Sequence, residues 1–357
     1  MKKISLILSF ILIILTLSAF FGCGTKSHSF TFTAFGSPLY VEVHGKTLTN
    51  DVTDKIKEEL KSLEEEFSVN KKNSALSKIN SSLNYTLSDR GVEVFSLAKE
   101  YYSFSNGKFN PAVYPLSKLW HFTKDTEVVK EQFSPPKVTE ISQVLDSGIL
   151  DFDKIKLKEN LLEKHDINCQ FDLGGMLKGY ASDRVLEILS AYGYNKGYVS
   201  FGSSSMCLME VEKLAIRHPE KNTEILLELN TKNLKNLSVS TSGDYEKYYE
   251  YEGVRYSHII DSKTGYPYST GVISVTLLGD DGAFLDAMTT ALCNCNFNEE
   301  SLYDNELTQF ANKILARETS ASIYAVYSKN GRKFLITNKE QGVDFTLLDN
   351  EYNIVKI

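Results

Sequence analysis

The chain has 357 residues, of which 42% are hydrophobic and 24% are charged, and its formal net charge is −7 at pH 7. An acidic surface repels the phosphate backbone of nucleic acids, and no cluster of Lys or Arg interrupts it, so the sequence argues against a nucleic-acid partner. A ligand that carries phosphate would therefore need a local cation or a metal ion to bind here.

The N-terminus has the pattern of an export signal. Two lysines precede an apolar run over 4–21, and a glycine comes directly before Cys23. We predict a bacterial lipoprotein signal peptide over 1–22, lipidation of Cys23 and a polar tether over 23–29, which together export the protein and anchor it to a membrane. A permanent transmembrane helix is the alternative, but the run barely reaches spanning length and contains Ser and Thr. Loss of the signal removes two lysines and no acid, so the net charge changes from −7 to −9.

Periodic apolar residues predict the first elements after the tether. Alternation over 30–43 indicates strands, and residues 51–67 repeat apolar side chains at helical spacing. A second helix is predicted over 178–192, and Gly193 ends it. Residues 106–122 are rich in aromatic residues and proline, and we expect them to form an irregular pocket wall with Trp120 packed in the core.

Short alternating runs dominate the second half of the chain. They predict strands over 254–260, 271–278, 322–327 and 333–337. Strands and helices mix without a regular βαβ rhythm, so we predict an α+β fold with mixed, mainly antiparallel sheets. No repeat or linker divides residues 30–357, and we expect a single compact unit with a central cleft.

Four cysteines follow Cys23, and their spacing is not that of a metal site. Cys293 and Cys295 are two residues apart near the end of an apolar segment, without a Cys-x-x-Cys or paired His pattern. We expect these two, together with Cys169 and Cys207, to be thiols in the core. A disulfide remains open, because export permits one.

Residues 171–181 place an acid, two glycines and a lysine at a predicted strand-to-helix turn. Two glycines allow the backbone to approach a ligand closely, and N–H groups at the start of a helix attract phosphate. The pattern therefore indicates a phosphate-binding turn that includes Asp172 and Lys178. The alternative is a glycine turn that serves geometry alone.

Asp286 and Thr290 are one helical turn apart, so their oxygens project from the same face of a predicted helix. Leu285, Met288 and Leu292 form the opposite, apolar stripe. A carboxylate and a hydroxyl are hard ligands, and they suit Mg²⁺ better than zinc. The alternative is an exposed Asp beside a Thr that bonds to its own backbone.

Residues 241–246 are predicted to form a polar turn, and residues 261–267 a tight loop after a strand. Between them lies His258, one of six histidines in the chain. In a polar pocket His258 can accept a proton or donate a hydrogen bond to a ligand. A structural histidine within a strand is the alternative.

The four motifs follow one another in a fixed order. They are Asp172-Leu-Gly-Gly-x-x-Lys178-Gly-Tyr-Ala, Ser242-Gly-Asp-Tyr-Glu, His258-Ile-Ile-Asp-x-x-Thr-Gly-Tyr-Pro267 and Asp286-Ala-x-x-Thr290-Ala. In order and spacing this set strongly resembles the ApbE family, the FAD:protein FMN transferases. Weaker agreement extends from residue 30 to about residue 340.

The resemblance implies an enzyme that binds FAD and Mg²⁺ and transfers FMN to a Thr or Ser hydroxyl of an exported acceptor flavoprotein, with release of AMP. It implies that the metal is held by Asp286, Thr289, Thr290 and the backbone oxygen of Gly175. The implied FAD contacts are Phe35, Asn70, Asn110, Pro111, Ala112, Asp172, Lys178 and Ile260.

The chemistry of the residues agrees with this implication. Attack on the FMN phosphorus builds charge on the diphosphate oxygens, where a metal and backbone donors stabilise it. Lys178 adds a cation, and His258 is the candidate base, although a metal-assisted route needs no dedicated base. Two other functions share these motifs: hydrolysis of FAD to FMN and AMP, and non-enzymatic FAD binding by a lipoprotein.

Overall fold

The computed structural model describes residues 26–357 except 203, 222, 233 and 339–342. The predicted signal peptide and Cys23 lie outside the described residues. Within the described part of the chain, no helix is both long and apolar enough to cross a membrane. The first strand begins at Ser27, so it takes up the last residues of the predicted tether.

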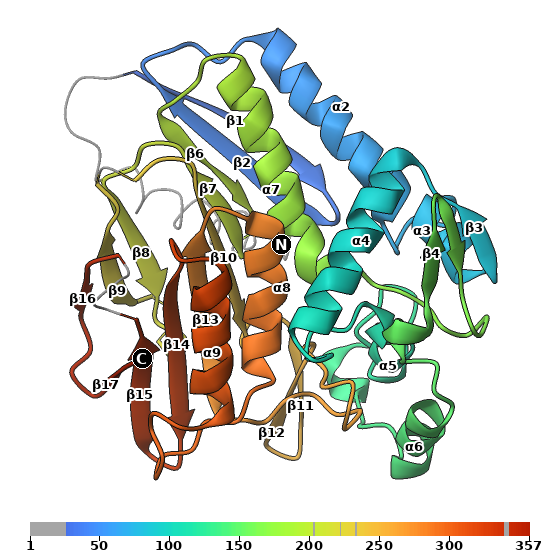
Figure 1. Ribbon diagram of the computed structural model, residues 1–357. Helices are drawn as coiled ribbons and strands as arrows, with labels where there is room; N and C mark the ends of the chain where they lie inside the picture. Colours follow the sequence, from blue (N-terminus) through green and yellow to red (C-terminus); the bar gives the residue numbers. More distant parts are fainter. Residues whose placement is uncertain (1–25, 203, 222, 233, 339–342) are drawn as a thin grey trace.

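The centre of the fold is a nine-stranded sheet whose order is β1-β2-β6-β7-β10-β13-β14-β15-β17 (Figure 1). Its strands are β1 (Ser27–Ala34), β2 (Ser37–His44), β6 (Gly197–Phe201), β7 (Ser205–Leu208), β10 (Leu237–Gly243), β13 (Val272–Gly279), β14 (Ser322–Lys329), β15 (Arg332–Thr337) and β17 (Asn353–Lys356). Neighbouring strands are antiparallel except β15 and β17, which are parallel. The predicted α+β class with mainly antiparallel sheet is therefore confirmed.

Helices cover one face of this sheet (Figure 1). The α-helices are α2 (Asn50–Phe67), α3 (Ala75–Asn80), α4 (Asp89–Phe104), α5 (Tyr114–Leu119), α6 (Val138–Asp146), α7 (Gly174–Ala191), α8 (Gly282–Cys293) and α9 (Glu306–Arg317). Helices α7 and α8 pack against each other and against β10. The main hydrophobic core lies between these helices and the sheet.

Three smaller sheets complete the fold. They are β8 (Lys213–Arg217), β9 (Ile225–Asn230) and β16 (Phe345–Leu347); β11 (Tyr248–Tyr251) and β12 (Val254–Ser257); and β3 (Asn84–Thr86), β4 (Lys156–Lys158) and β5 (Leu161–Glu163). The sheet of β8, β9 and β16 shares a second hydrophobic core with β10 and β14 of the central sheet. The central sheet is thus covered on both faces, which explains why its middle strands are almost wholly buried.

Successive side chains of β10 point alternately toward the two hydrophobic cores. Leu237 and Val239 contribute to the core with β8 and β9. Successive side chains of a strand point to opposite faces, so Ser238, Ser240 and Ser242 face the helices. This strand therefore presents a row of hydroxyls to α7 and α8.

Most predicted elements agree with the structure, and the strand predicted over 254–260 is shorter, as β12 ends at Ser257. Helix α2 buries the predicted stripe of Ile56, Leu60, Leu63 and Phe67. Helix α7 begins at Gly174 rather than residue 178, so the paired glycines form its first turn. Residues 241–243 are the end of β10 rather than a turn.

The predicted irregular segment over 106–122 is wrong in part. It contains the 3₁₀ helix η1 (Pro111–Val113) and helix α5, because each has proline in its first turn, where no backbone N–H is needed. The core position predicted for Trp120 is confirmed, since its ring is fully buried and its indole N–H donates to the carbonyl oxygen of Gly265 at 2.8 Å.

Helix α8 is buried on nearly every side, which was not predicted. Asp286 is 3% exposed and Thr289 is fully buried, because α7 covers the face that the sequence assigned to a cavity or solvent. Among the described residues of α8, Asp286 and Thr290 line a cleft.

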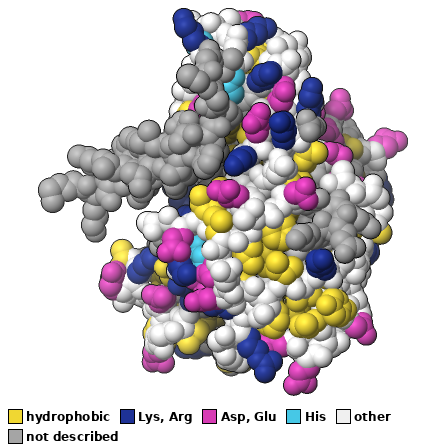
Figure 2. Space-filling model, turned by 90° about the vertical axis from the view of Figure 1, so that its left-hand side faces the viewer, with side chains coloured by type: hydrophobic (Ala, Val, Ile, Leu, Met, Phe, Trp, Pro, Cys, Tyr) yellow, Lys and Arg dark blue, Asp and Glu magenta, His cyan; other side chains and the backbone are white. Residues whose placement is uncertain are grey.

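The four cysteines that the structure describes are buried and free, as predicted. The short η2 (Lys130–Gln132) and η3 (Phe152–Lys154) connect the remaining elements. On the face of the molecule drawn in Figure 2, acidic and basic side chains are interspersed rather than gathered by sign, and hydrophobic side chains form a patch in its lower half.

Candidate active site

The four sequence motifs meet at one cleft of about 300 Å³. It is lined by the segment over 108–117, the start of α7, the end of β10, the segment after β12 and the face of α8 that carries Asp286 and Thr290. The predicted site residues in its lining are Asn110, Asp172, Gly175, Lys178, His258, Ile260, Asp286 and Thr290. A cleft of this size suits part of a nucleotide ligand, with the remainder lying along its open side.

Asn80 holds the chain that leads into α7. Its side-chain amide donates to the carbonyl oxygen of Phe171 at 2.9 Å and accepts from the N–H of Phe171 at 2.7 Å. The next residue, Asp172, donates its backbone N–H to the carbonyl oxygen of Pro111 at 2.8 Å. The carboxylate of Asp172 accepts from the N–H of Gly174 at 2.8 Å, and burial raises its pKa.

The first turn of α7 packs directly on the end of α8. A Cβ at Gly175 would lie 3.2 Å from the ring of Phe109 and 3.6 Å from Oγ1 of Thr290. Any larger side chain at this position would extend into the space between the two helices. Gly175 therefore brings the helix backbone close to Thr290.

A second glycine sets the crossing of the same two helices. A Cβ at Gly179 would lie 2.0 Å from the carbonyl oxygen of Gly282, a distance that real contacts do not allow. At this crossing the N–H of Gly179 donates to Oδ2 of Asp286 at 3.0 Å. In a regular helix that N–H would donate to the carbonyl oxygen of Gly175 alone, so this carbonyl has capacity for another partner.

Asp286 is a buried carboxylate. Among the described residues it accepts hydrogen bonds from the N–H of Gly179 and from Oγ of Ser205 at 3.4 Å. Burial raises its pKa to about 6, and the positive charge of Lys178 opposes that rise. A cation beside this carboxylate would stabilise its charged form.

The two threonines of α8 lie in different surroundings. Oγ1 of Thr289 donates to the carbonyl oxygen of Asp286 at 2.8 Å and lies 2.9 Å from Oγ of Ser242, behind the cleft wall. Thr290 lines the cleft, and its Oγ1 is 3.4 Å from the same carbonyl oxygen. The structure therefore brings Gly175, Asp286 and Thr290 to the cleft and leaves Thr289 behind them.

This donor set consists of hard oxygens, which fits Mg²⁺. The described residues contain no group of three His, Cys, Asp or Glu side chains arranged to hold a metal ion. The set proposed from the sequence has one carboxylate, so the rest of the coordination shell would come from Thr290, the carbonyl of Gly175, water and ligand oxygens.

Lys178 supplies positive charge to the cleft. Its ammonium donates to Oγ of Ser204, and its charge lowers the pKa of both Asp286 and His258. Lys108 also lines the cleft, but its ammonium is held by the carbonyl oxygen of Asn294 at 2.7 Å and by Glu306 at 2.6 Å. Lys178 is thus the better placed of the two to meet a ligand phosphate.

His258 is a neutral histidine in the cleft wall. Its Nδ1 lies 3.1 Å from the carbonyl oxygen of Lys247, which can only accept, so Nδ1 carries the proton and Nε2 is an acceptor. The ring is enclosed on most sides, and this burial lowers its pKa to about 4. The backbone bond to Lys247 raises the pKa and the charges of Lys178 and Lys247 lower it.

Asn110 borders the cleft with its side chain fully engaged. Its Oδ1 accepts from the N–H of Ala112 at 2.9 Å, and its Nδ2 donates to the carbonyl oxygen of Leu150 at 2.9 Å and to Oγ of Ser262 at 3.1 Å. Pro111 and Ala112 are buried next to it. These three residues fix the position of the cleft wall.

Four implied FAD contacts lie outside this lining: Pro111, Ala112, Phe35 and Asn70. Phe35 occupies the turn between β1 and β2 with φ of +50°. Its N–H donates to Glu64 at 2.9 Å, and its ring centroid is 6.2 Å from that of Phe201. Asn70 is exposed in the turn after α2. No contact of Phe35 or Asn70 with the cleft is found in the described chain.

Several cleft residues were not singled out as site residues from the sequence. Ser117 and Lys108 come from the segment predicted to be irregular, and Ser204 follows the end of β6. Their spacing carries no pattern that marks them. Thr241 and Glu246 also line the cleft, and both lie within the predicted polar turn, which was the available signal.

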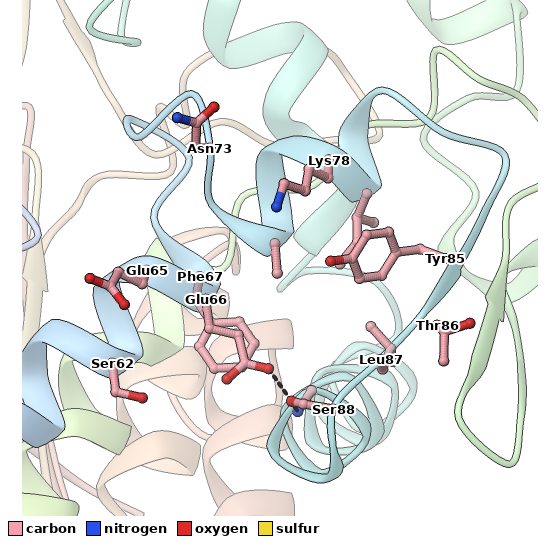
Figure 3. Close-up of a pocket in the computed structure, with 13 residues that line it drawn as sticks. Ser62, Glu65, Glu66, Phe67, Asn73, Lys78, Tyr85, Thr86, Leu87 and Ser88 are labelled. Carbon is pink, nitrogen blue, oxygen red and sulfur yellow. Dashed lines mark hydrogen bonds between the residues drawn. The ribbon is translucent and has the colours of Figure 1, made fainter.

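A second cavity, of about 410 Å³, lies between the end of α2, α3, β3 and the start of α4 (Figure 3). Ser88 donates to Glu66 there and accepts from the N–H of Gly91 at 2.9 Å, as an N-cap of α4 does. None of the four motifs contributes a residue to its lining. Its charged lining residues Glu65, Glu66 and Lys78 belong to none of the motifs, and Glu66 accepts from the N-cap residue of α4.

A sequence model of the ApbE family matches residues 33–308. The chain belongs to the ApbE family. The FAD:protein FMN transferase of Klebsiella pneumoniae (strain 342) is 25% identical over 341 residues, which are 92% of this chain and 98% of that relative. The resemblance carried by the four motifs is thereby confirmed.

Solved structures agree with this ApbE assignment. The ApbE protein of Thermotoga maritima has a TM-score of 0.71 with 25% identity, and the match covers 85% of this chain and 94% of that one. The flavin transferase ApbE of Vibrio cholerae has a TM-score of 0.72 with 21% identity, covers 91% of this chain and 97% of its own, and supports the fold.

Proposed function

We propose that this ApbE-family protein is an enzyme that transfers the FMN half of FAD to a Thr or Ser hydroxyl of an exported flavoprotein and releases AMP, with Mg²⁺ as cofactor. The observation that carries the proposal is the convergence of Gly175, Lys178, Asp286 and Thr290 at one cleft. A relative that matches nearly all of the chain bears the name of this transferase activity.

The proposed reaction breaks the phosphoanhydride bond of FAD and forms a phosphoester bond to the acceptor. The oxygen of the acceptor hydroxyl bonds to the phosphorus of the FMN half, and the bond from that phosphorus to the bridging oxygen breaks. AMP leaves with the bridging oxygen, and the hydroxyl proton passes to a base. Negative charge grows on the bridging oxygen and the non-bridging oxygens, so groups that stabilise anions accelerate the step.

The residues of the cleft match this demand. Lys178 brings a positive charge, and the start of α7 directs backbone N–H groups toward an anion. Asp286, Thr290 and the carbonyl of Gly175 would hold Mg²⁺, which supplies positive charge to the diphosphate when bound. Burial raises the pKa of Asp286 to about 6, and a cation bound beside it would stabilise the charged carboxylate.

His258 is the proposed proton acceptor. Its pKa of about 4 keeps the ring neutral throughout the physiological range, and the bond to Lys247 fixes Nε2 as the unprotonated nitrogen. A base with a low pKa is weak, but it is always in the form that accepts a proton. The N-terminal pattern further suggests that the acceptor protein lies on the same side of the membrane as a lipid-anchored enzyme.

The test uses the mature protein with FAD, Mg²⁺ and a folded acceptor that carries a Thr. We expect a fluorescent acceptor band that survives denaturing electrophoresis, together with one AMP per flavin transferred. Removal of Mg²⁺ with a chelator should abolish both products. An acceptor in which Thr is replaced by Ala is the matched control and should remain unlabelled.

Two other outcomes would replace the proposal. Release of AMP and FMN without a labelled acceptor would identify an FAD hydrolase, in which water takes the place of the hydroxyl. FAD bound in stoichiometric amount without AMP release, with or without Mg²⁺, would identify a flavin-binding protein.

A further inference from the structure

Helices α7 and α8 repeat one short sequence pattern where they cross. Gly179 and Asp183 are four residues apart on α7, and Gly282 and Asp286 are four residues apart on α8. Residues at this spacing share a helix face. The two Gly-x-x-x-Asp faces are turned toward each other, because Gly179 contacts both Gly282 and Asp286.

The contacts between the two faces are reciprocal. The N–H of Gly179 on α7 donates to the carboxylate of Asp286 at 3.0 Å. The N–H of Gly282 on α8 donates to the carboxylate of Asp183 at 2.8 Å. Each helix thus gives a glycine N–H to the other helix and receives one in return.

Both bonds require that neither glycine carry a side chain. A Cβ at Gly179 would lie 2.0 Å from the carbonyl oxygen of Gly282, and a Cβ at Gly282 would lie 2.5 Å from Oδ1 of Asp183. The absence of both Cβ atoms lets the backbones approach closely enough for carboxylate contacts. The N–H of Gly282 is one of the first four of α8, which have no partner within the helix.

Strand β10 contacts both helices beside this crossing. Ser238 donates to Oδ1 of Asp183 at 2.7 Å, and Cys207 of the neighbouring strand lies 3.4 Å from that oxygen. Four residues along β10, Ser242 lies 2.9 Å from Oγ1 of Thr289 on α8. The hydroxyls of this strand therefore contact both helices, whereas the bonds that join α7 directly to α8 are those of the two glycine N–H groups.

We propose that Asp183 is a positioning residue for the metal site. It holds the first turn of α8 against α7 and thereby sets where Asp286 and Thr290 lie relative to Gly175. Asp183 does not line the cleft, so it acts through α8 rather than by touching a ligand. This inference rests on the proposed function, because it concerns the site assigned to Mg²⁺.

The test compares Asp183→Ala with Ser238→Ala. Asp183→Ala leaves the N–H of Gly282 without its partner and frees the start of α8, whereas Ser238→Ala removes a bond to Asp183 and leaves the bond to α8 intact. For Asp183→Ala we expect at least a tenfold higher Mg²⁺ concentration for half-maximal AMP release, with turnover at saturating Mg²⁺ within about threefold of wild type. Ser238→Ala should stay within twofold of wild type in both quantities.

Binding of the metal alone gives a second readout. Mn²⁺, titrated into each protein and followed by electron paramagnetic resonance, should show the same loss of affinity in Asp183→Ala. Asp183→Asn keeps an oxygen acceptor for Gly282 and should restore most of the affinity, which a general loss of stability would not predict. Thermal denaturation confirms that each variant is folded.

A folded Asp183→Ala protein with wild-type Mg²⁺ and Mn²⁺ dependence would overturn the inference and leave the proposed function standing. If that variant does not fold, Gly282→Ala displaces the carboxylate sterically and should show the same loss; wild-type metal affinity there would also overturn the inference. Failure of the wild-type protein to bind either metal would instead refute the metal site itself.

Discussion

The two cavities of this protein are similar in size and differ in what surrounds them. The cavity of about 410 Å³ in Figure 3 is enclosed by consecutive elements of one part of the chain, from α2 to α4. The cleft of about 300 Å³ is lined by several segments, distant from one another in the sequence, between residues 108 and 290. The two cavities therefore differ in whether their lining residues are close or distant in the sequence, and not mainly in volume.

The two cavities also differ in the roles of their titratable and polar groups. In the cleft, burial raises the pKa of Asp172 and Asp286 and lowers that of His258. The polar groups around Ser88 instead satisfy the end of a helix. Perturbed titratable groups that gather in one cleft are typical of active sites, and capping groups are not.

The largest expected effect is on activity, from Asp286→Asn. We expect Mg²⁺-dependent AMP release to fall by about 10³-fold, because the amide keeps the shape but loses the charge that holds a cation. Without metal, the free energy of unfolding at pH 8 should stay equal or rise. The raised pKa means that the charged carboxylate contributes unfavourably to folding above pH 6, and the amide removes that contribution.

A matched change in the other cavity is Glu66→Gln. It replaces a carboxylate that also accepts a hydrogen bond, and AMP release should remain within twofold of wild type. Equal loss of activity in the two variants would erase the distinction between the cavities.

Gly179→Ala should have the next largest effect. Its Cβ would lie 2.0 Å from the carbonyl oxygen of Gly282, so α7 and α8 must separate, and we expect a loss of about 3 kcal/mol in the free energy of unfolding. Gly91→Ala in α4 is the control, since its nearest atom would be 3.1 Å away and Ala favours a helix. Urea denaturation of the control should differ from wild type by less than about 1 kcal/mol.

The pH dependence of stability tests the neutrality of His258. Its folded pKa of about 4 lies below the ordinary value of 6.5, so the unfolded chain takes up a proton first as the pH falls. Stability should therefore be lost between pH 6.5 and pH 4, by at most about 3 kcal/mol from this group. His258→Asn keeps a donor for the carbonyl of Lys247 and should lack this part of the slope.

Urea denaturation at intervals of half a pH unit measures the difference between the two proteins. All other titrating groups are shared, so the difference isolates His258. Identical slopes would contradict the neutral assignment. The same variant at pH 7 should also transfer FMN more slowly while retaining its Mg²⁺ dependence, as expected for a proton acceptor.

Helices and strands were predictable from the sequence where one face is buried and the other is exposed to solvent. Helix α2 shows its apolar stripe directly in the sequence for this reason. The start of α7 was missed because glycine is a poor helix former, and its place in the first turn depends on contact with α8. The end of β10, residues 241–243, was predicted to be a turn because Ser242 faces the helices and its partner on α8 is distant in sequence.

The motifs of the candidate site were predictable from the sequence, but the burial of the helix that carries two of its residues was not. Asp286 and Thr290 were identified from helical spacing, yet the burial of α8 follows from packing between α7 and the sheet. The same packing turns Thr289 away from the cleft. Sequence spacing alone does not distinguish a cleft-facing hydroxyl from one that bonds to the strand behind it.

The smallest expected effect belongs to the cavity of Figure 3. Ser88→Ala removes the acceptor for the N–H of Gly91 at the start of α4 and should lower the free energy of unfolding by about 1 kcal/mol. Ser88→Asn retains an N-cap acceptor and should recover most of that stability. AMP release by both variants should equal that of wild type, because the cap is local to α4. A change in Mg²⁺ dependence in Ser88→Ala would show that the two cavities are coupled, and the functional contrast between them would no longer hold.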